Sequence, residues 1–154
     1  MTTSTRSPST VRRSPVQLTS LVVGLMFVVV GIAGFVPGIT TDMGDMAGAG
    51  HTSGSHLLGV FQVSVLHNVL HLLLGVLGIL AARASGAARA FLLVGGIAYA
   101  GLWIYGLLVD QTSSANFVPL NTADNWLHLV LAAGMILLAL IMPRRTTVAT
   151  AEHA

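Results

Sequence analysis

Residues 57–109 read LLGVFQVSVLHNVLHLLLGVLGILAARASGAARAFLLVGGIAYAGLWIYGLLV. This stretch holds two long apolar runs, about 57–82 and 90–109, with a short turn between them that carries Arg83 and Arg89. Each run reaches the roughly 20 apolar residues that a helix needs to cross a bilayer. The stretch therefore predicts two membrane-spanning helices joined by a tight turn.

Two further apolar runs flank this pair, at about 16–36 and 125–142. The first run is too long for a signal peptide, and no Ala-x-Ala cleavage site follows it, so we expect it to stay in place as a span. The chain is 54% hydrophobic and 8% charged, whereas soluble domains carry about 25% charged residues. The predicted fold is an all-α, four-helix antiparallel transmembrane bundle, with a disordered tail over 1–14 and a short polar tail over 144–154.

The basic residues fall at one end of the four expected spans. All seven are Arg, and four of the five acidic residues lie in the two connections at the other end. The Arg residues are Arg6, Arg12, Arg13, Arg83, Arg89, Arg144 and Arg145; the acidic residues are Asp42, Asp45, Asp110 and Asp124. Because cytoplasmic flanks collect Lys and Arg, we expect a cytoplasmic-membrane protein with both termini in the cytoplasm. The small basic clusters suit lipid headgroups and do not form the continuous surface that nucleic acid requires.

One face of the second expected helix changes from polar to small residues along its length. Small residues let helices pack closely, and an unpartnered polar group in hydrocarbon costs several kcal/mol. The polar positions are Ser64, His67, Asn68 and His71, and the small positions are Gly75, Gly78 and Ala82. A similar face on the fourth helix carries Asn125, His128, Ala132 and Ala139. We expect the two polar ends to meet between the helices, near the outer leaflet.

The pattern Asn-x-x-His-Leu occurs at Asn68 and again at Asn125. It suggests a parallel repeat of two helical hairpins. Before the second copy, Asn121 stands three residues ahead of Asp124, which predicts a helix start with Asn121 as N-cap and Asp124 in support.

Three interpretations of the histidine positions stay open. In the first, Asn and His side chains hydrogen-bond across helices and hold their register. In the second, His67, His71 and His128 bind a transition metal, or two of these histidines bind haem. In the third, the cluster lines a path for protons or a small solute, since intramembrane His is costly and tends to be functional.

The first outer loop offers a separate candidate metal site, since Met, His and carboxylate side chains together suit copper or another divalent ion. Its residues are Asp42, Met43, Asp45, Met46 and His51. A flexible Gly-rich loop with incidental Met residues is the simpler interpretation. No nucleophile with a base and no phosphate-binding loop is evident, so we expect a non-enzymatic protein with no catalytic residues, and a homo-oligomer or a membrane-protein partner remains an open alternative.

Several strings resemble domain-of-unknown-function family 4383, a family of small four-span membrane proteins common in actinobacteria. The strings are GFVPGIT, AGHTSGSHLLG, LLGVFQVSVLHNVLHLLLGVLG and ANFVPLNTADNWLHLVLAAGMI, and the resemblance covers about residues 18–142. It implies a four-helix integral membrane protein with no assigned activity. The recurrent residues of that family fall here on His51, on His67, Asn68 and His71, and on Asn125, Trp126 and His128.

Overall fold

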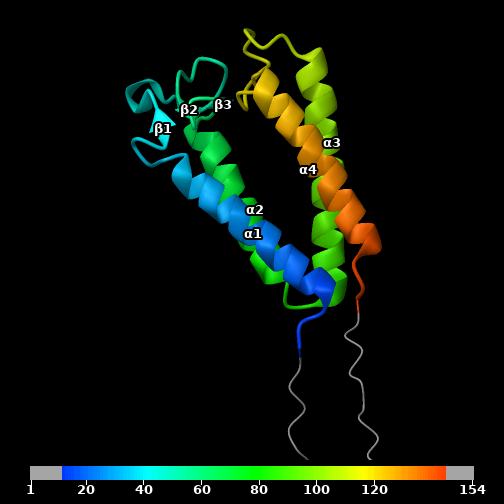
Figure 1. Ribbon diagram of the computed structural model, residues 1–154. Coiled ribbons are helices and arrows are strands. Elements are labelled where there is room, and N and C mark those ends of the chain that lie inside the picture. Colours follow the sequence, from blue (N-terminus) through cyan, green and yellow to red (C-terminus); the bar gives the residue numbers. More distant parts are fainter. Residues whose placement is uncertain (1–11, 145–154) are drawn as a thin grey trace, which may run out of the picture.

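The computed structural model describes residues 12–144, so the predicted tails lie outside the described residues except at their inner ends. Its helices are α1 (Pro15–Ala33), α2 (Val65–Ala81), α3 (Ser85–Leu108) and α4 (Thr122–Ile141). Helix α1 packs mainly on α2, and α3 mainly on α4, so the chain forms two helical hairpins whose outer loops lie at the same end (Figure 1). The predicted all-α architecture of four helices is confirmed.

Three of the helices, α1, α3 and α4, are long and apolar enough to cross a membrane. Helix α2 is equally apolar but has 17 residues, the lower end of the range that spans a bilayer. Large apolar side chains such as Val22, Val29, Val94 and Val130 are exposed on the outer faces. These lengths and faces suit a multi-pass membrane protein in a lipid environment.

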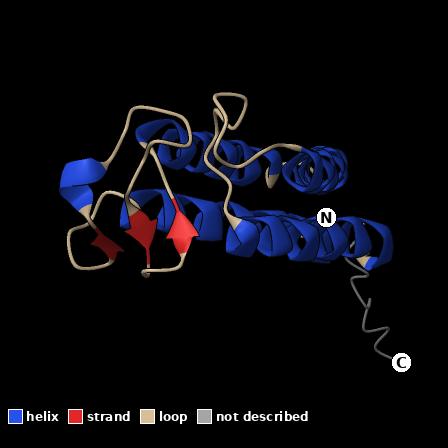
Figure 2. Cartoon of the chain, turned by 90° about the horizontal axis from the view of Figure 1, so that it is seen from above, coloured by secondary structure: helices blue, strands red, loops and turns tan. Residues whose placement is uncertain are grey.

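The apolar run that begins at Leu57 becomes helical only at Val65. Its first part forms a small antiparallel sheet with the preceding loop, and the three strands gather at one side of the helices (Figure 2). The strands are β1 (Thr40–Thr41), β2 (His56–Leu57) and β3 (Phe61–Gln62). Leu58 and Gly59 have φ values of 54° and 70°, the left-handed pair that a tight hairpin turn requires. The predicted helix over 57–82 is therefore about eight residues too long at its start, because apolar content alone does not separate strand from helix.

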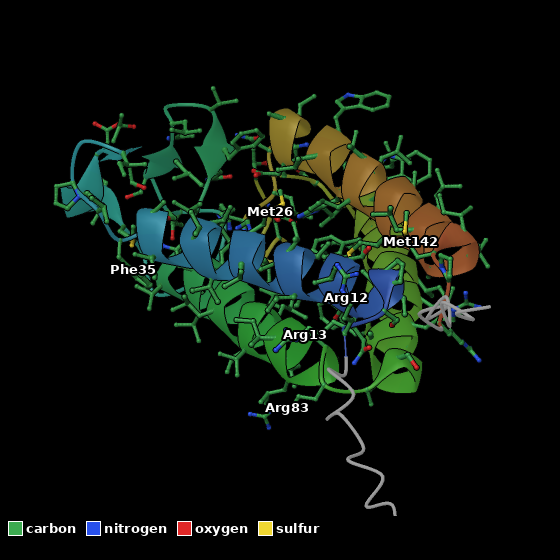
Figure 3. The ribbon with its side chains drawn as sticks, turned by 60° about the horizontal axis from the view of Figure 1, so that its bottom comes forward. Arg12, Arg13, Met26, Phe35, Arg83 and Met142 are labelled. Carbon is green, nitrogen blue, oxygen red and sulfur yellow. The ribbon has the colours of Figure 1, made fainter. Side chains whose placement is uncertain are left out.

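Helix α3, in contrast, starts before the predicted position, at Ser85. Arg89 consequently lies within α3 and donates from Nη2 to the carbonyl oxygen of Met142 at 2.9 Å. At the same end, the N–H of Val16 donates to the carbonyl of Pro143. Arg12, Arg13 and Arg83 lie at the end that also holds Met142, and Phe35 lies at the opposite end of α1 (Figure 3). The described Arg residues thus share one end of the bundle, as the charge pattern predicts.

The small residues of α2 pack on another helix, and that helix is α1. Gly75 and Gly78 are buried against Gly24 of α1. A Cβ built at Gly24 would lie 2.8 Å from the carbonyl oxygen of Gly75, so the two backbones meet at the closest distance that helices allow. Ser20 Oγ, one turn away, donates to the carbonyl of Gly78 at 2.8 Å.

The similarity of the two hairpins extends well beyond Asn-x-x-His-Leu. Buried positions of α2 and α4 are separated by the same 57 positions, and buried positions of α1 and α3 by 72. The first set pairs Asn68 with Asn125, Gly75 with Ala132, Gly78 with Met135 and Ala82 with Ala139. The second set pairs Val16 with Ala88, Gly24 with Gly96, Phe27 with Tyr99 and Gly34 with Gly106. The two hairpins therefore bury the same faces, and the first has the longer outer loop.

Candidate functional site

Helices α2 and α4 both begin with a side-chain cap, at the end of the bundle that carries the two long loops. Ser64 Oγ accepts from the N–H of His67 at 3.2 Å. Asn121 Oδ1 accepts from the N–H of Asp124 at 2.9 Å, and Asp124 Oδ2 accepts in return from the N–H of Asn121. The predicted cap at Asn121 is confirmed, whereas Ser64 serves its helix start and does not belong to the helical face that the sequence suggested.

The two Asn residues hold each hairpin closed. The side-chain amide of Asn68 lies against Gly34 at the end of α1, and that of Asn125 lies against Gly106 near the end of α3, in both cases where a Cβ would collide. Both Asn side chains are buried. Asn68 Nδ2 reaches Met46 Sδ at 4.0 Å, while Asn125 Oδ1 has no hydrogen-bond partner among the described residues. The packing supports a structural part for both Asn residues, in line with the first interpretation.

The three membrane histidines come together where the hairpins meet. The His67 and His71 rings stack at a centroid distance of 4.7 Å, and the His67 and His128 rings lie 6.4 Å apart. Sequence spacing predicts this meeting. The structure adds Phe27 and Tyr99, which stack on each other at 5.6 Å. Phe27 contacts His71 at 5.8 Å, and the equivalent pair, Tyr99 and His128, lies 5.2 Å apart.

The imidazole nitrogens differ in how they are satisfied. His71 Nδ1 bonds to the carbonyl of His67 at 3.0 Å. His67 and His128 are only 5% and 4% exposed. Their Nδ1 atoms are buried and nevertheless have no hydrogen-bond partner among the described residues. Buried polar atoms normally have hydrogen-bond partners, so these two nitrogens mark a candidate binding position.

Asp124 joins the cluster, which sequence reasoning did not predict. It is 2% exposed, and its Oδ2 accepts from the N–H groups of Gln62 and Asn121, each at 3.0 Å. The Gln62 bond ties the sheet of the first hairpin to the start of α4. The 57-residue spacing between the two hairpins could have indicated this position, because it makes Asp124 the counterpart of His67.

Two small cavities flank the cluster, with volumes of about 130 and 210 Å³. His67, His71 and His128 line both cavities. The smaller one also contacts Asp124, and the larger one contacts Tyr99. Their other walls correspond through the repeat, because Val30 and Leu127 line the first where Leu102 and Leu70 line the second. Each side of the cluster thus has an apolar cavity with imidazoles in its wall.

Metal coordination was the second interpretation of these histidines. Over residues 12–144, no group of three or more His, Cys, Asp or Glu side chains is placed to hold a metal ion. Imidazole nitrogens suit zinc or copper. However, the His67 and His71 rings stack on one another, and this arrangement favours a hydrogen-bonded ligand over a metal ion that the histidines coordinate together.

The candidates of the first outer loop take part in loop structure. Asp42 lies at a positive φ of 53° ahead of the short helix η1 (Met43–Asp45). The carbonyl of Asp42 accepts from Ser55 Oγ, and the carbonyl of Asp45 accepts from the N–H of Gly54. The His51 carbonyl accepts from Gln62 Nε2. Within the described residues, these contacts order the loop through its backbone. Of the predicted loop ligands, Met46 is the one whose side chain contacts Asn68 of α2.

A family model described as "Domain of unknown function (DUF4383)" matches residues 17–141. Nothing among the curated proteins or the solved structures matches the chain.

Proposed function

Because the chain belongs to the DUF4383 family, whose description assigns no function, we propose its function from the histidine cluster. It is a multi-pass protein of the cytoplasmic membrane that binds a small molecule between its two hairpins and catalyses no reaction on it. The histidines hold the ligand by hydrogen bonds, and the two Asn residues keep the hairpins in register around it.

One observation carries this proposal: the Nδ1 atoms of His67 and His128 are buried, unpartnered among the described residues, and belong to side chains that line cavities. Leaving a buried hydrogen-bonding group unsatisfied costs about 1–3 kcal/mol. His56 and His71, in contrast, each bond through Nδ1 to a backbone carbonyl, of Gly54 and His67 respectively. A bound molecule that supplies the missing partners removes this cost.

The ligand prediction uses His128→Phe, which keeps a ring against Tyr99 and removes both nitrogens. Small molecules that co-purify with the full-length protein in mild detergent are extracted and quantified by mass spectrometry. We expect a stoichiometric ligand in the wild-type protein and a loss of about tenfold or more in the variant, because a lost hydrogen bond to a buried group costs about 1.4 kcal/mol or more.

His51→Phe, in the outer loop and away from the cluster, is the matched control and should keep the ligand. Equal ligand content in His128→Phe and wild type would refute the proposed site. A visible absorption spectrum and elemental analysis of the same samples test the alternative. A Soret band or a stoichiometric metal that His128→Phe loses would assign the cluster to haem or metal binding.

The orientation is part of the proposal: the end with Arg12, Arg83 and Arg89 faces the cytoplasm, and the cluster lies toward the outer leaflet. The positive-inside distribution of the Arg residues supports this.

Because the chain contains no Cys, a single introduced Cys is the only thiol of the protein that a maleimide can label. On intact cells, an impermeant maleimide should label Ser114→Cys in the second outer loop and should label Ala84→Cys in the α2–α3 turn only after permeabilisation. The reverse pattern would invert the topology.

A further inference from the structure

An apolar groove runs between α1 and α4 on one side of the molecule, with a volume of about 350 Å³. Met26 of α1 lies between these two helices (Figure 3). The groove's walls are apolar side chains except at one end, where His71 closes it. Its principal lining residues are Val23, Met26 and Val30 of α1, and Val130, Gly134 and Leu138 of α4.

The groove continues into the smaller histidine cavity. Val30, His71 and Leu127 line both spaces. A molecule that occupies both would contact only apolar side chains along α1 and α4, and would meet His67, His128 and Asp124 at its other end. The walls of the combined space are therefore apolar, and the imidazoles and the Asp124 carboxyl are the only polar side chains that line it, at the loop side of the bundle.

That polarity matches a lipid of the outer leaflet, whose head lies near the surface and whose chain points to the midplane. The charge of the head group follows from the walls: neither space is lined by Lys or Arg, and the one carboxylate, Asp124, already accepts two N–H groups. An anionic head would be buried here without a counter-ion, and burying an unpaired charge is costly. An uncharged hydroxyl or carbonyl can bond to imidazole nitrogen at no such cost.

We propose that the ligand of the histidine cluster is a single-chain lipid with an uncharged hydroxyl or carbonyl head group, which enters sideways from the bilayer through the α1–α4 groove. This inference rests on the proposed ligand-binding function and adds the class of ligand and its route. Long-chain alcohols and isoprenoid quinones share the required chemistry, and the experiment separates them.

Gly134 provides the decisive variant. A Cβ built at Gly134 meets no atom within 4 Å, so a Leu there fits the helix and occupies the groove; the corresponding residue of α2 is Leu77. Displacing two or more methylene groups from the groove lowers affinity by about tenfold. Gly101 of α3 is equally open but lies outside the groove, so Gly101→Leu is the matched control. Val130→Phe fills the groove from a second, exposed position.

The probe is a long-chain alcohol with a photoreactive diazirine midway along its chain, applied to the full-length protein in lipid nanodiscs. Labelling is expected on peptides of α1 and α4, and it should fall about tenfold in Gly134→Leu and Val130→Phe but not in Gly101→Leu. An excess of unlabelled alcohol or of a short-chain isoprenoid quinone should compete, and whichever competes at lower concentration names the head group. A fatty acid anion of equal length should compete poorly.

Two results would overturn the inference. One is equal labelling of wild type and both groove variants, and the other is equal labelling of the groove and of the lipid-facing side of α3 around Val94 and Ile97. If Gly134→Leu still co-purifies with the ligand that His128→Phe loses, the histidine site holds and the groove assignment fails. If neither variant changes ligand content, the proposed function fails as well.

Discussion

Gly75→Leu is expected to prevent the first hairpin from closing. A Cβ at Gly75 would lie 2.7 Å from both the carbonyl oxygen of Gly24 and the backbone N of Val28. Backbone atoms cannot move aside as a flexible side chain can, so α1 and α2 must separate. Overpacking of a filled interface costs about 1–3 kcal/mol, and a full Leu against backbone belongs at or above the upper end of that range.

The loss of stability is measured as the decrease in the midpoint of thermal unfolding in detergent. Unfolding is monitored by the fraction of protein that remains monodisperse in size-exclusion chromatography. Gly101→Leu adds the same side chain to a lipid-facing position with no atom within 4 Å of the new Cβ, and it should leave the midpoint unchanged. Equal stability of the two variants would show that the close approach of α1 and α2 is not what holds the hairpin.

Asp124→Ala is expected to destabilise the junction between the hairpins by about 2–4 kcal/mol. The substitution leaves the half-buried N–H groups of Gln62 and Asn121 without their acceptor. A fully buried unsatisfied group costs about 1–3 kcal/mol, so two half-buried groups should together cost less than twice that maximum. One oxygen, Oδ2, accepts both bonds, so Asp124→Asn, which keeps an acceptor oxygen, should recover most of the stability. Unfolding midpoints of the three proteins, measured side by side, check this order.

Asp110→Ala is the matched control at the other end of the same loop. Asp110 is exposed, and its Oδ1 accepts from the side chain and the N–H of Thr112, which lower the pKa of Asp110. Because both partners can bond to water instead, the substitution should leave the unfolding midpoint essentially unchanged. A larger loss for Asp110→Ala than for Asp124→Ala would contradict the importance of the buried junction.

The histidine site shows how far sequence spacing reaches. His67, His71 and His128 could be assigned to one cluster because polar residues in an apolar helix must face a partner. Asp124 was assigned only to the helix cap, because its equivalence to His67 shows only when the 57-position spacing of Asn68 and Asn125 is extended to neighbouring residues of different type. Phe27 is one of many apolar residues in its helix, and Tyr99 resembles an ordinary aromatic residue of a membrane helix, so nothing singled them out.

The beginning of α2 shows a different limit. The run from Leu57 has the composition of a membrane helix, and only the positive φ values at Leu58 and Gly59 reveal the turn between β2 and β3. Leu is not a residue that usually adopts this conformation. The turn closes the pairing of β2 with β3, and the N–H of Leu58 donates to the carbonyl of Ile39, 19 positions earlier.

By itself, the sequence determined that the chain forms four apolar helices, that the Arg residues share one end, that the Gly face of α2 packs on another helix and that Asn121 caps α4. These properties depend on composition and on spacings within one helix, and both can be read along the chain. The tertiary structure alone decided that Asp124 joins the histidines, that Asn68 and Asn125 lie on equivalent glycines, and that a groove between α1 and α4 leads to His71. These depend on how helices distant in sequence rotate and approach one another, which packing of the whole bundle sets and no single helix encodes.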